Sequence, residues 1–84
     1  MRDIRWHADQ NGVPDCWVAA NERHGELAFI RKIKDGWFIS FTQNILDKAR
    51  AKKKLALLDS IHIDALFSTQ KVAKRVATEL LSLI

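Results

Sequence analysis

Basic side chains gather in one stretch of this chain, between residues 31 and 54. That stretch holds eight basic and two acidic side chains, a local net charge of +6, whereas the whole chain of 84 residues has a formal net charge of +4. Concentrated positive charge attracts phosphate groups regardless of base sequence, and an aromatic ring beside it offers a surface on which bases stack. We therefore predict a nucleic-acid-binding surface. Its predicted residues are Arg31, Lys32, Lys34, Phe38, Lys48, Arg50, Lys52, Lys53 and Lys54.

Residues that could perform catalysis or hold a metal are few and scattered. Each of the three glycines suits a turn, so the sequence has no glycine-rich phosphate loop. His7, His24 and His62 lack the spacing of a zinc site, and the chain has a single cysteine. We interpret Cys16 as a small buried strand residue, because free cysteines are often buried. We expect no enzymatic activity, no cofactor and no metal site.

Length and composition narrow the class of protein. A chain of 84 residues forms one domain, residues 1–84, and an apolar fraction of 48% is ordinary for a folded domain. The single cysteine rules out an intrachain disulfide, and the charged start does not resemble a signal peptide. No stretch reaches the roughly 18 apolar residues that a membrane span requires. We expect a soluble, cytoplasmic protein with no membrane contact.

The first half of the chain reads as short strands joined by turns, over residues 4–7, 16–21, 27–33 and 37–43. Alternation places Cys16, Val18 and Ala20 on one side of the second strand and Trp17 on the other. Of the three tryptophans, Trp17 is the one that we expect to be exposed.

A hairpin over residues 27–43 is the clearest unit of that half. Residues 34–36 have the form of a three-residue loop, a type I turn closed by Gly36, which would pair Ile33 with Trp37. The predicted core face then carries Leu27, Phe29, Ile33, Trp37, Ile39 and Phe41. The predicted wet face carries Ala28, Ile30, Lys32, Phe38, Ser40 and Thr42. Arg31 falls on this core face and interrupts its apolar pattern. A two-residue turn would shift the register by one residue and mix apolar and polar residues on both faces.

The basic segment from residue 44 to 58 has two interpretations. Its composition favours a helix over about 45–57, capped by Asn44 with Asp47 near the positive end of the helix dipole. The rival interpretation is a long strand, a basic loop and a second strand. Residues 60–64 alternate and are a candidate short strand.

The C-terminal segment predicts an amphipathic helix, capped by Ser68 or Thr69. Its apolar stripe consists of Val72, Ala73, Val76, Ala77, Leu80, Leu81 and Ile84. The predicted fold class is α+β, a three- or four-stranded antiparallel meander packed by this helix on one face. The other face stays wet, and on such a fold it is the expected place for function.

The order of these signals resembles a type of small protein found in phages and prophages. The matching pieces are Trp6, Trp17-Val18-Ala19, Gly36-Trp37, Phe67-Ser68-Thr69, and Ala73-Lys74 with Ala77. The resemblance implies a meander-plus-helix fold and an origin on a mobile element, but no activity. The layout is also similar to the sheet-and-helix modules with which phage integrases and AP2-type plant factors bind DNA.

Two functions follow from charge and layout. The leading hypothesis is a non-enzymatic module that binds nucleic acid through a basic sheet face and the segment 31–54. The alternative is a protein-binding inhibitor or adaptor that acts on a host protein complex, where an acidic surface would be the natural complement. The plainest interpretation is that the lysines form a solvated helix face. A homodimer through open sheet edges, or through Leu80, Leu81, Leu83 and Ile84, is a related hypothesis.

Overall fold

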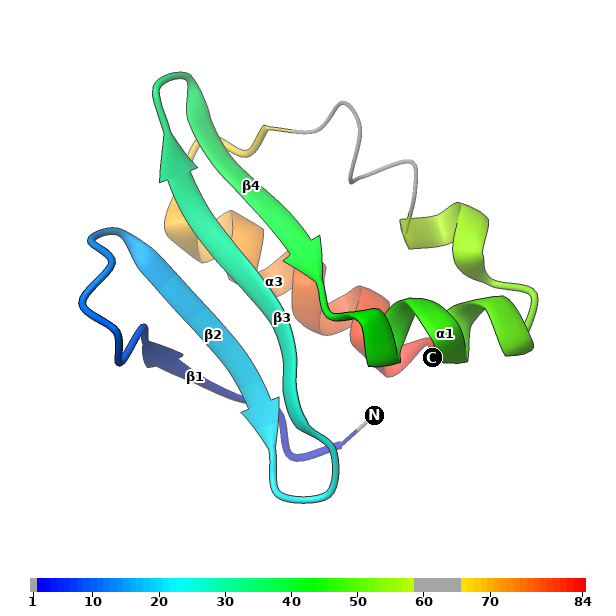
Figure 1. Cartoon of the computed structure of the whole chain (residues 1–84). Coiled ribbons are helices and arrows are strands. Elements are labelled where there is room, and N and C mark those ends of the chain that lie inside the picture. Colours follow the sequence, from blue (N-terminus) through cyan, green and yellow to red (C-terminus); the bar gives the residue numbers. More distant parts are fainter. Residues whose placement is uncertain (1, 59–65) are drawn as a thin grey trace.

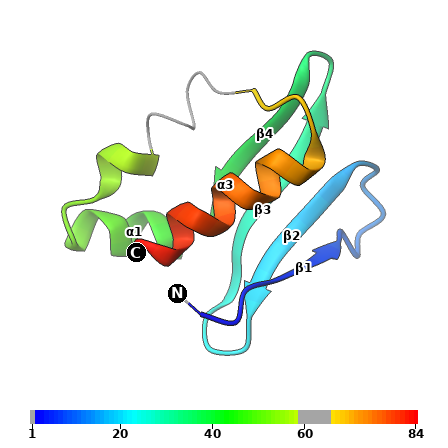
Figure 2. The ribbon, with the colours of Figure 1, turned by 180° about the vertical axis from the view of Figure 1, so that it is seen from behind.

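A four-stranded antiparallel sheet with a helix across one face makes up this protein (Figures 1 and 2). The computed structural model describes residues 2–58 and 66–84. Strand order in the sheet follows the chain, which confirms the predicted α+β meander with a packed C-terminal helix. The elements are β1 (Arg5–Ala8), β2 (Cys16–Asn21), β3 (Gly25–Ile33), β4 (Gly36–Phe41), α1 (Gln43–Ala51) and α3 (Gln70–Ser82). Within the described residues, no helix has both the length and the apolar character that crossing a membrane would require.

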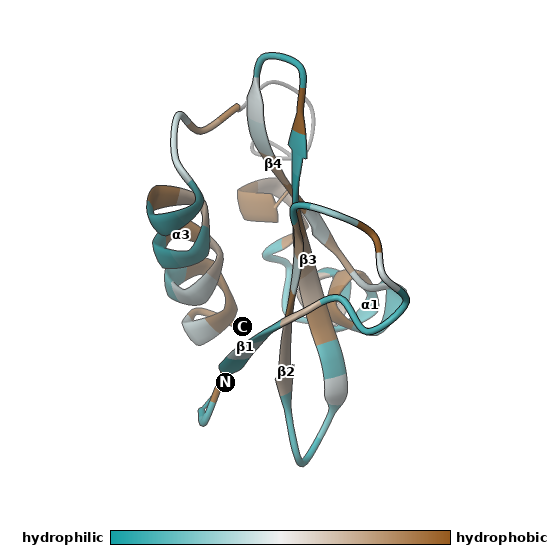
Figure 3. Cartoon of the chain, turned by 90° about the vertical axis from the view of Figure 1, so that its left-hand side faces the viewer, coloured by the Kyte–Doolittle hydropathy of each residue, from teal (hydrophilic) through white to brown (hydrophobic). Residues whose placement is uncertain are grey.

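Cross-strand pairing sorts the strand residues into two faces. We call the face under α3 the helix face and the opposite one the open face (Figure 3). The helix face carries Trp6, Trp17, Ala19, Ala28, Ile30, Trp37, Ile39 and Phe41. The open face carries Arg5, His7, Cys16, Val18, Ala20, Phe29, Arg31, Phe38 and Ser40. The sides predicted for β2 are confirmed, because Trp17 and Ala19 face α3 while Val18 faces away from it.

The hairpin between β3 and β4 turns through two residues, so the predicted three-residue loop was wrong. Ile33 pairs with Gly36 and Lys32 pairs with Trp37. The shift puts Ile30 in the core at 0% exposure and leaves Ile33 42% exposed. The core positions predicted for Phe29 and Ile33, and the wet position predicted for Ile30, were therefore also wrong.

The physical reason for this register is visible at Arg31 and at the start of β4. A three-residue loop would direct Arg31 into the core, where an unpaired charge is costly to bury. The observed turn leaves Arg31 exposed on the open face. Trp37 also exchanges two backbone hydrogen bonds with Phe67, each 2.8 Å long, and these hold the start of β4 in place. A Cβ on Gly36 would lie 2.9 Å from the Phe67 carbonyl oxygen, so glycine is required at this approach.

A bulge at Leu27 changes the alternation along β3. Ala19 pairs with Ala28, but Ala20 pairs with Glu26, so Leu27 has no partner on β2. Leu27 and Ala28 are both fully buried, although they are adjacent in the strand. The Leu27 carbonyl instead accepts a hydrogen bond from the Thr42 backbone N–H at 3.1 Å, which ties the start of α1 to the sheet.

Helix α3 covers the helix face with its small residues. Ala73, Ala77 and Leu81 are fully buried against the sheet, as the predicted stripe requires. The Thr69 side chain accepts a hydrogen bond from the Val72 backbone N–H at 3.2 Å, which confirms the predicted cap. The alanines carry no bulk beyond Cβ, so the helix approaches the strands closely.

Two tryptophans on the helix face also contact polar groups of α3. The Trp6 indole donates a hydrogen bond to the Thr78 hydroxyl at 3.1 Å. The Lys74 Nζ lies 3.6 Å from the centroid of the Trp17 ring, within cation–π range. Trp17 is partly buried and packs on the core, so its predicted exposure was wrong.

The basic segment after β4 is helical, which decides between its two interpretations. Helix α1 begins after Thr42, which is the N-cap residue in place of the predicted Asn44. The helix breaks where Lys53 adopts a left-handed φ of 58°, and residues 55–58 form a further helical turn. Leu58 and Ile45 are both buried in the core, so the segment packs and is not an isolated helix. The candidate strand at 60–64 lies outside the described residues.

Candidate nucleic-acid interface

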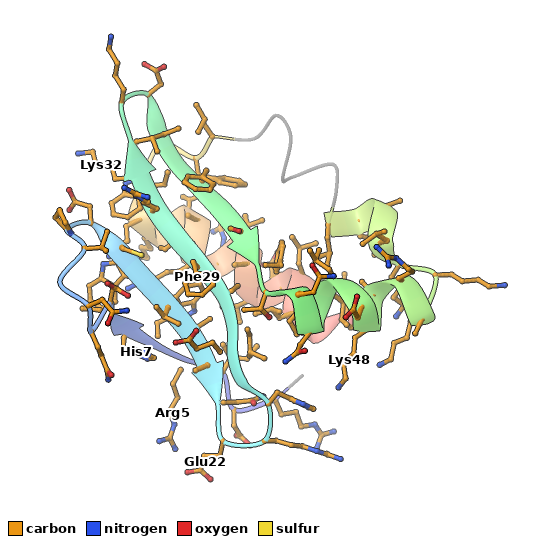
Figure 4. All side chains as sticks on the ribbon, viewed as in Figure 1. Arg5, His7, Glu22, Phe29, Lys32 and Lys48 are labelled. Atoms are coloured by element: carbon orange, nitrogen blue, oxygen red, sulfur yellow. The ribbon has the colours of Figure 1, made fainter. Side chains whose placement is uncertain are left out.

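Two phenylalanines and an arginine lie together on the open face. Arg31 of β3 stands directly opposite Phe38 of β4, and Phe29 precedes Arg31 by two residues on the same face. We call Phe29, Arg31 and Phe38 the open-face cluster; Phe29 is labelled in Figure 4. The alternation of strand side chains places these three residues side by side without any help from loops.

The open-face cluster lies beside a buried residue of β2, and its rings are accessible. Val18 of β2 pairs with Phe29 and is only 2% exposed. The centre of the open face is therefore less exposed to solvent than predicted. Phe29 and Phe38 are partly exposed and Arg31 is exposed. Within residues 2–58 and 66–84, no carboxylate forms an ion pair with Arg31. A free guanidinium beside two aromatic rings can contact a phosphate while the rings accept a base.

The hairpin places the predicted basic residues differently from the prediction. Lys32 pairs with Trp37 on the helix face, so Lys32 and Phe38 do not share a face as predicted. The cationic neighbour of Phe38 is Arg31, because the two-residue turn exchanges the faces of these adjacent residues. Lys34 is exposed at the hairpin tip, near the end of both faces.

The charges of α1 lie far from those of the hairpin. Figure 4 shows Lys32 near the hairpin tip and Lys48 on α1, at opposite ends of the molecule. The Lys48 Nζ lies 3.4 Å from the His24 Nε2 at the turn between β2 and β3. Arg50 is exposed on the same helix. The structure therefore does not bring the predicted residues into one patch.

Two lysines of the segment 52–54 are held by the C-terminal end of the chain. Lys52 donates from Nζ to the Ile84 carbonyl oxygen, and Lys54 donates from Nζ to the Leu83 carbonyl oxygen at 2.6 Å. The last carbonyls of a helix carry partial negative charge, so these lysines stabilise the end of α3. Lys53 is exposed.

Further residues of the open face were absent from the predicted set. Phe29 was assigned to the core, while Arg5 and His7 of β1 were not included in the nucleic-acid-binding set. His7 pairs with Val18, and Val18 with Phe29, so one cross-strand row leads from β1 to the open-face cluster. The sequence did contain a signal, because Arg31 on the predicted core face already argued against the assumed register.

Acidic groups border the open face at both ends. Glu26 lies beside Ala20 and Arg5 in one row. Asp9 follows β1, and its carboxylate already accepts hydrogen bonds from the Asn11 and Val13 backbone N–H groups, at 3.2 and 3.1 Å. These two carboxylates offset the charges of Arg5 and Arg31 on the open face, where Arg31 is the cation that lies beside the two rings.

The thiol on the open face is unsuited to nucleophilic chemistry. Cys16 lies beside Arg31 in the same row, opposite the start of the hairpin. Burial raises the pKa of the Cys16 thiol, and the nearby Asp9 carboxylate raises it further. A thiol held in its protonated form is a poor nucleophile. Among the residues that the structure describes, no group of three or more His, Cys, Asp and Glu side chains is placed to hold a metal ion.

Most of the apolar side chains at the C-terminal end of the chain pack in the core. Leu81 is fully buried and Ile84 is 7% exposed, whereas Leu83 is 51% exposed. Of the apolar set predicted to form a dimer contact, Leu83 is thus the side chain that extends furthest into solvent.

The chain was also compared with known proteins. It matches no protein-family model, no curated protein and no solved structure.

Proposed function

We propose that the protein is a non-enzymatic module that binds single-stranded nucleic acid through the open-face cluster. The observation that carries this proposal is the placement of Arg31 directly opposite Phe38, with Phe29 on the same face of the sheet, opposite α3. Helix α3 covers the other face, so a nucleic-acid strand can reach the rings of both Phe29 and Phe38.

A single strand suits this surface better than a duplex. Bases of a single strand can leave their own stack and lie on an aromatic ring, which stabilises binding by roughly 1–3 kcal/mol per base. Duplex bases are already stacked, and they offer the flat sheet face mainly their phosphates. Arg31 supplies the contact to the phosphate backbone of the nucleic acid. Exposed Lys34 adds a second positive charge at the hairpin tip.

The direct test is fluorescence anisotropy with labelled single-stranded oligonucleotides at low and high salt. Phe38→Leu keeps an apolar side chain but removes the ring, and Arg31→Gln removes the charge. Each change should weaken binding about tenfold. The matched control is Arg75→Gln, an equal loss of charge at an exposed position of α3, on the other side of the sheet.

Three results distinguish a binding site on the open face from diffuse attraction and from no binding. Binding that declines with salt, falls in both open-face variants and persists in Arg75→Gln supports the proposal. Equal losses in Arg31→Gln and Arg75→Gln would show diffuse attraction with no site on the open face. Absence of binding to any oligonucleotide at low salt would refute the proposal outright.

A protein-binding adaptor is the second candidate, and one observation favours it. Ile33 and Leu66 both adjoin Gly36 near the hairpin tip, and they are 42% and 46% exposed. Two exposed apolar side chains beside basic Lys34 suit a protein surface with apolar and acidic groups. Retention of a protein partner that is lost in Ile33→Ser, with no oligonucleotide binding, would favour this function over the first.

A further inference from the structure

A hollow of about 500 Å³ lies at the end of the sheet away from the hairpin tip. The segment before β1 and the turn between β2 and β3 form its walls, and Figure 4 labels Arg5 and Glu22 at this end. Four of its lining side chains are basic or can become so: Arg2, Arg5, Arg23 and His24. Two carboxylates, Asp3 and Glu22, also line it, so the lining has an excess of positive charge.

Asn21 fixes the walls of this hollow relative to each other. Its Oδ1 accepts a hydrogen bond from the His24 backbone N–H at 2.7 Å, which shapes the turn between β2 and β3. Its Nδ2 donates to the Arg2 carbonyl oxygen at 3.2 Å, which brings the N-terminal segment to the same place. Arg5 is fixed independently, because it pairs with Ala20 in the sheet. These backbone contacts therefore bring three arginines from two separate segments to the lining of one hollow.

Among the residues that the structure describes, the arginines of the hollow are not paired with the two carboxylates that also line it. Within the described parts of the chain, none of the guanidinium groups of Arg2, Arg5 and Arg23 forms an ion pair. His24 is partly buried, and Lys48 approaches its ring from α1. Loss of water around the ring lowers the pKa of His24, and the charges of Lys48 and Arg23 lower it further. When a multivalent anion enters such a hollow, it reduces the repulsion between the positive charges around it.

We infer that this hollow binds a phosphate group. Arginine forks match the paired oxygens of a phosphate, and three of them approach from two walls. The phosphate could belong to a nucleic-acid strand or to a free phosphorylated small molecule, and the chemistry of recognition is the same for both. The site does not depend on the open-face cluster, since none of the cluster residues lines it.

The first experiment is an NMR titration of the full chain with inorganic phosphate, against sodium chloride of equal ionic strength. Phosphate should give saturable shifts of the His24 ring and of the Arg5 side chain. Arg23→Gln and Arg2→Gln should each weaken the interaction about tenfold, or about 1.4 kcal/mol, because each removes one charge-assisted hydrogen bond. Arg75→Gln, remote on α3, is the matched control and should leave it unchanged. Unaltered amide spectra outside the turn would show that the variants fold.

Equal shifts in chloride and phosphate, or equal weakening in Arg23→Gln and Arg75→Gln, would overturn the site. A second arm identifies the source of the phosphate. If Arg23→Gln also weakens oligonucleotide binding, the hollow holds a phosphate of the strand. If oligonucleotides do not bind but the phosphate shifts persist in Phe38→Leu, the hollow binds a free phosphorylated compound. That result refutes the nucleic-acid function of the open-face cluster and leaves the phosphate site in place.

Discussion

Lys54 donates a hydrogen bond from Nζ to the Leu83 carbonyl oxygen at 2.6 Å and so joins the basic segment to the C-terminal end of α3. Lys52 donates from Nζ to the main-chain oxygen of Ile84, one residue further along the chain. Leu83 is the C-cap residue of α3, where carbonyl groups have no partner within the helix. Two lysines of the basic segment therefore make contacts within the fold.

Removal of both lysine contacts should destabilise the protein. We expect the double variant Lys52→Met, Lys54→Met to lose about 1–2 kcal/mol of unfolding free energy, because the helix end loses two charged donors. Urea unfolding measures this loss. Arg50→Met is the control, since Arg50 is exposed on α1 and its side chain makes no such contact within residues 2–58 and 66–84. A double variant as stable as the control would show that the two contacts contribute nothing.

The same contacts affect how binding variants are chosen. Changing Lys52, Lys53 and Lys54 together to Glu would place carboxylates against the carbonyls of Leu83 and Ile84. Loss of binding in that variant would report unfolding as readily as a lost phosphate contact. Arg31→Gln avoids this ambiguity, because Arg31 is exposed and holds no other element in place.

Gly36 is the glycine whose replacement should be most harmful. A Cβ at this position would lie 2.9 Å from the Phe67 carbonyl oxygen, in the stretch where Trp37 and Phe67 exchange backbone hydrogen bonds. We expect Gly36→Ala to cost at least about 2 kcal/mol in chemical denaturation, from strain and from displacement of Phe67. Gly12→Ala is the matched control: its φ of 79° is also strained, but no atom lies within 4 Å of the added carbon. We expect about 1 kcal/mol there, and equal losses would contradict the steric argument.

The hairpin shows how far sequence reasoning reached and where it failed. Strand positions and the C-terminal helix were predicted because alternation and a four-residue repeat are local signals. The register was not, because Lys34-Asp35-Gly36 is compatible with both a two- and a three-residue turn. The decision rests on contacts distant in sequence, namely the pairing of Trp37 with Phe67 and the burial of Ile30. The misplaced Arg31 was the one local sign that the assumed register was wrong.

Alanine substitution can test this register directly. Ile30 is fully buried opposite Ile39, so Ile30→Ala should cost about 2–5 kcal/mol of unfolding free energy. Phe29 lies on the open face and is partly exposed, so Phe29→Ala should cost less, although it removes a larger side chain. Thermal or urea unfolding of the two variants compares them. A larger loss for Phe29→Ala would favour the three-residue loop.

The candidate site was only partly accessible from the sequence. Charge clustering along the chain selected basic residues between 31 and 54, yet the fold separates the hairpin from α1 and joins Lys52 to a main-chain oxygen 32 residues away. Arg2, Arg5 and Arg23 form a spatial cluster that no sequence window contains. Strand pairing and the Asn21 hydrogen bonds assemble it, and neither can be read from local composition.

The contact between Lys48 and His24 gives the last prediction. Partial burial, followed by the charges of Lys48 and Arg23, holds the pKa of His24 below its ordinary value of 6.5. Replacing the ammonium group in Lys48→Met should raise that pKa toward 6.5, whereas Arg50→Met should not move it. An NMR pH titration of the His24 ring measures both. A wild-type pKa at or above 6.5, or no change in Lys48→Met, would contradict the assigned contact.

The shift also fixes the sign of a stability change with pH. Because the folded chain binds the His24 proton more weakly than the unfolded chain, protonation favours unfolding. The contribution of His24 should therefore decrease the unfolding free energy as pH falls from 6.5 through the lowered pKa of the folded state. His24→Gln should remove that part of the pH dependence, and urea unfolding of both proteins across this window tests it. Bound phosphate should act in the opposite direction, since an anion beside the ring favours its protonated form and restores stability at the acid end.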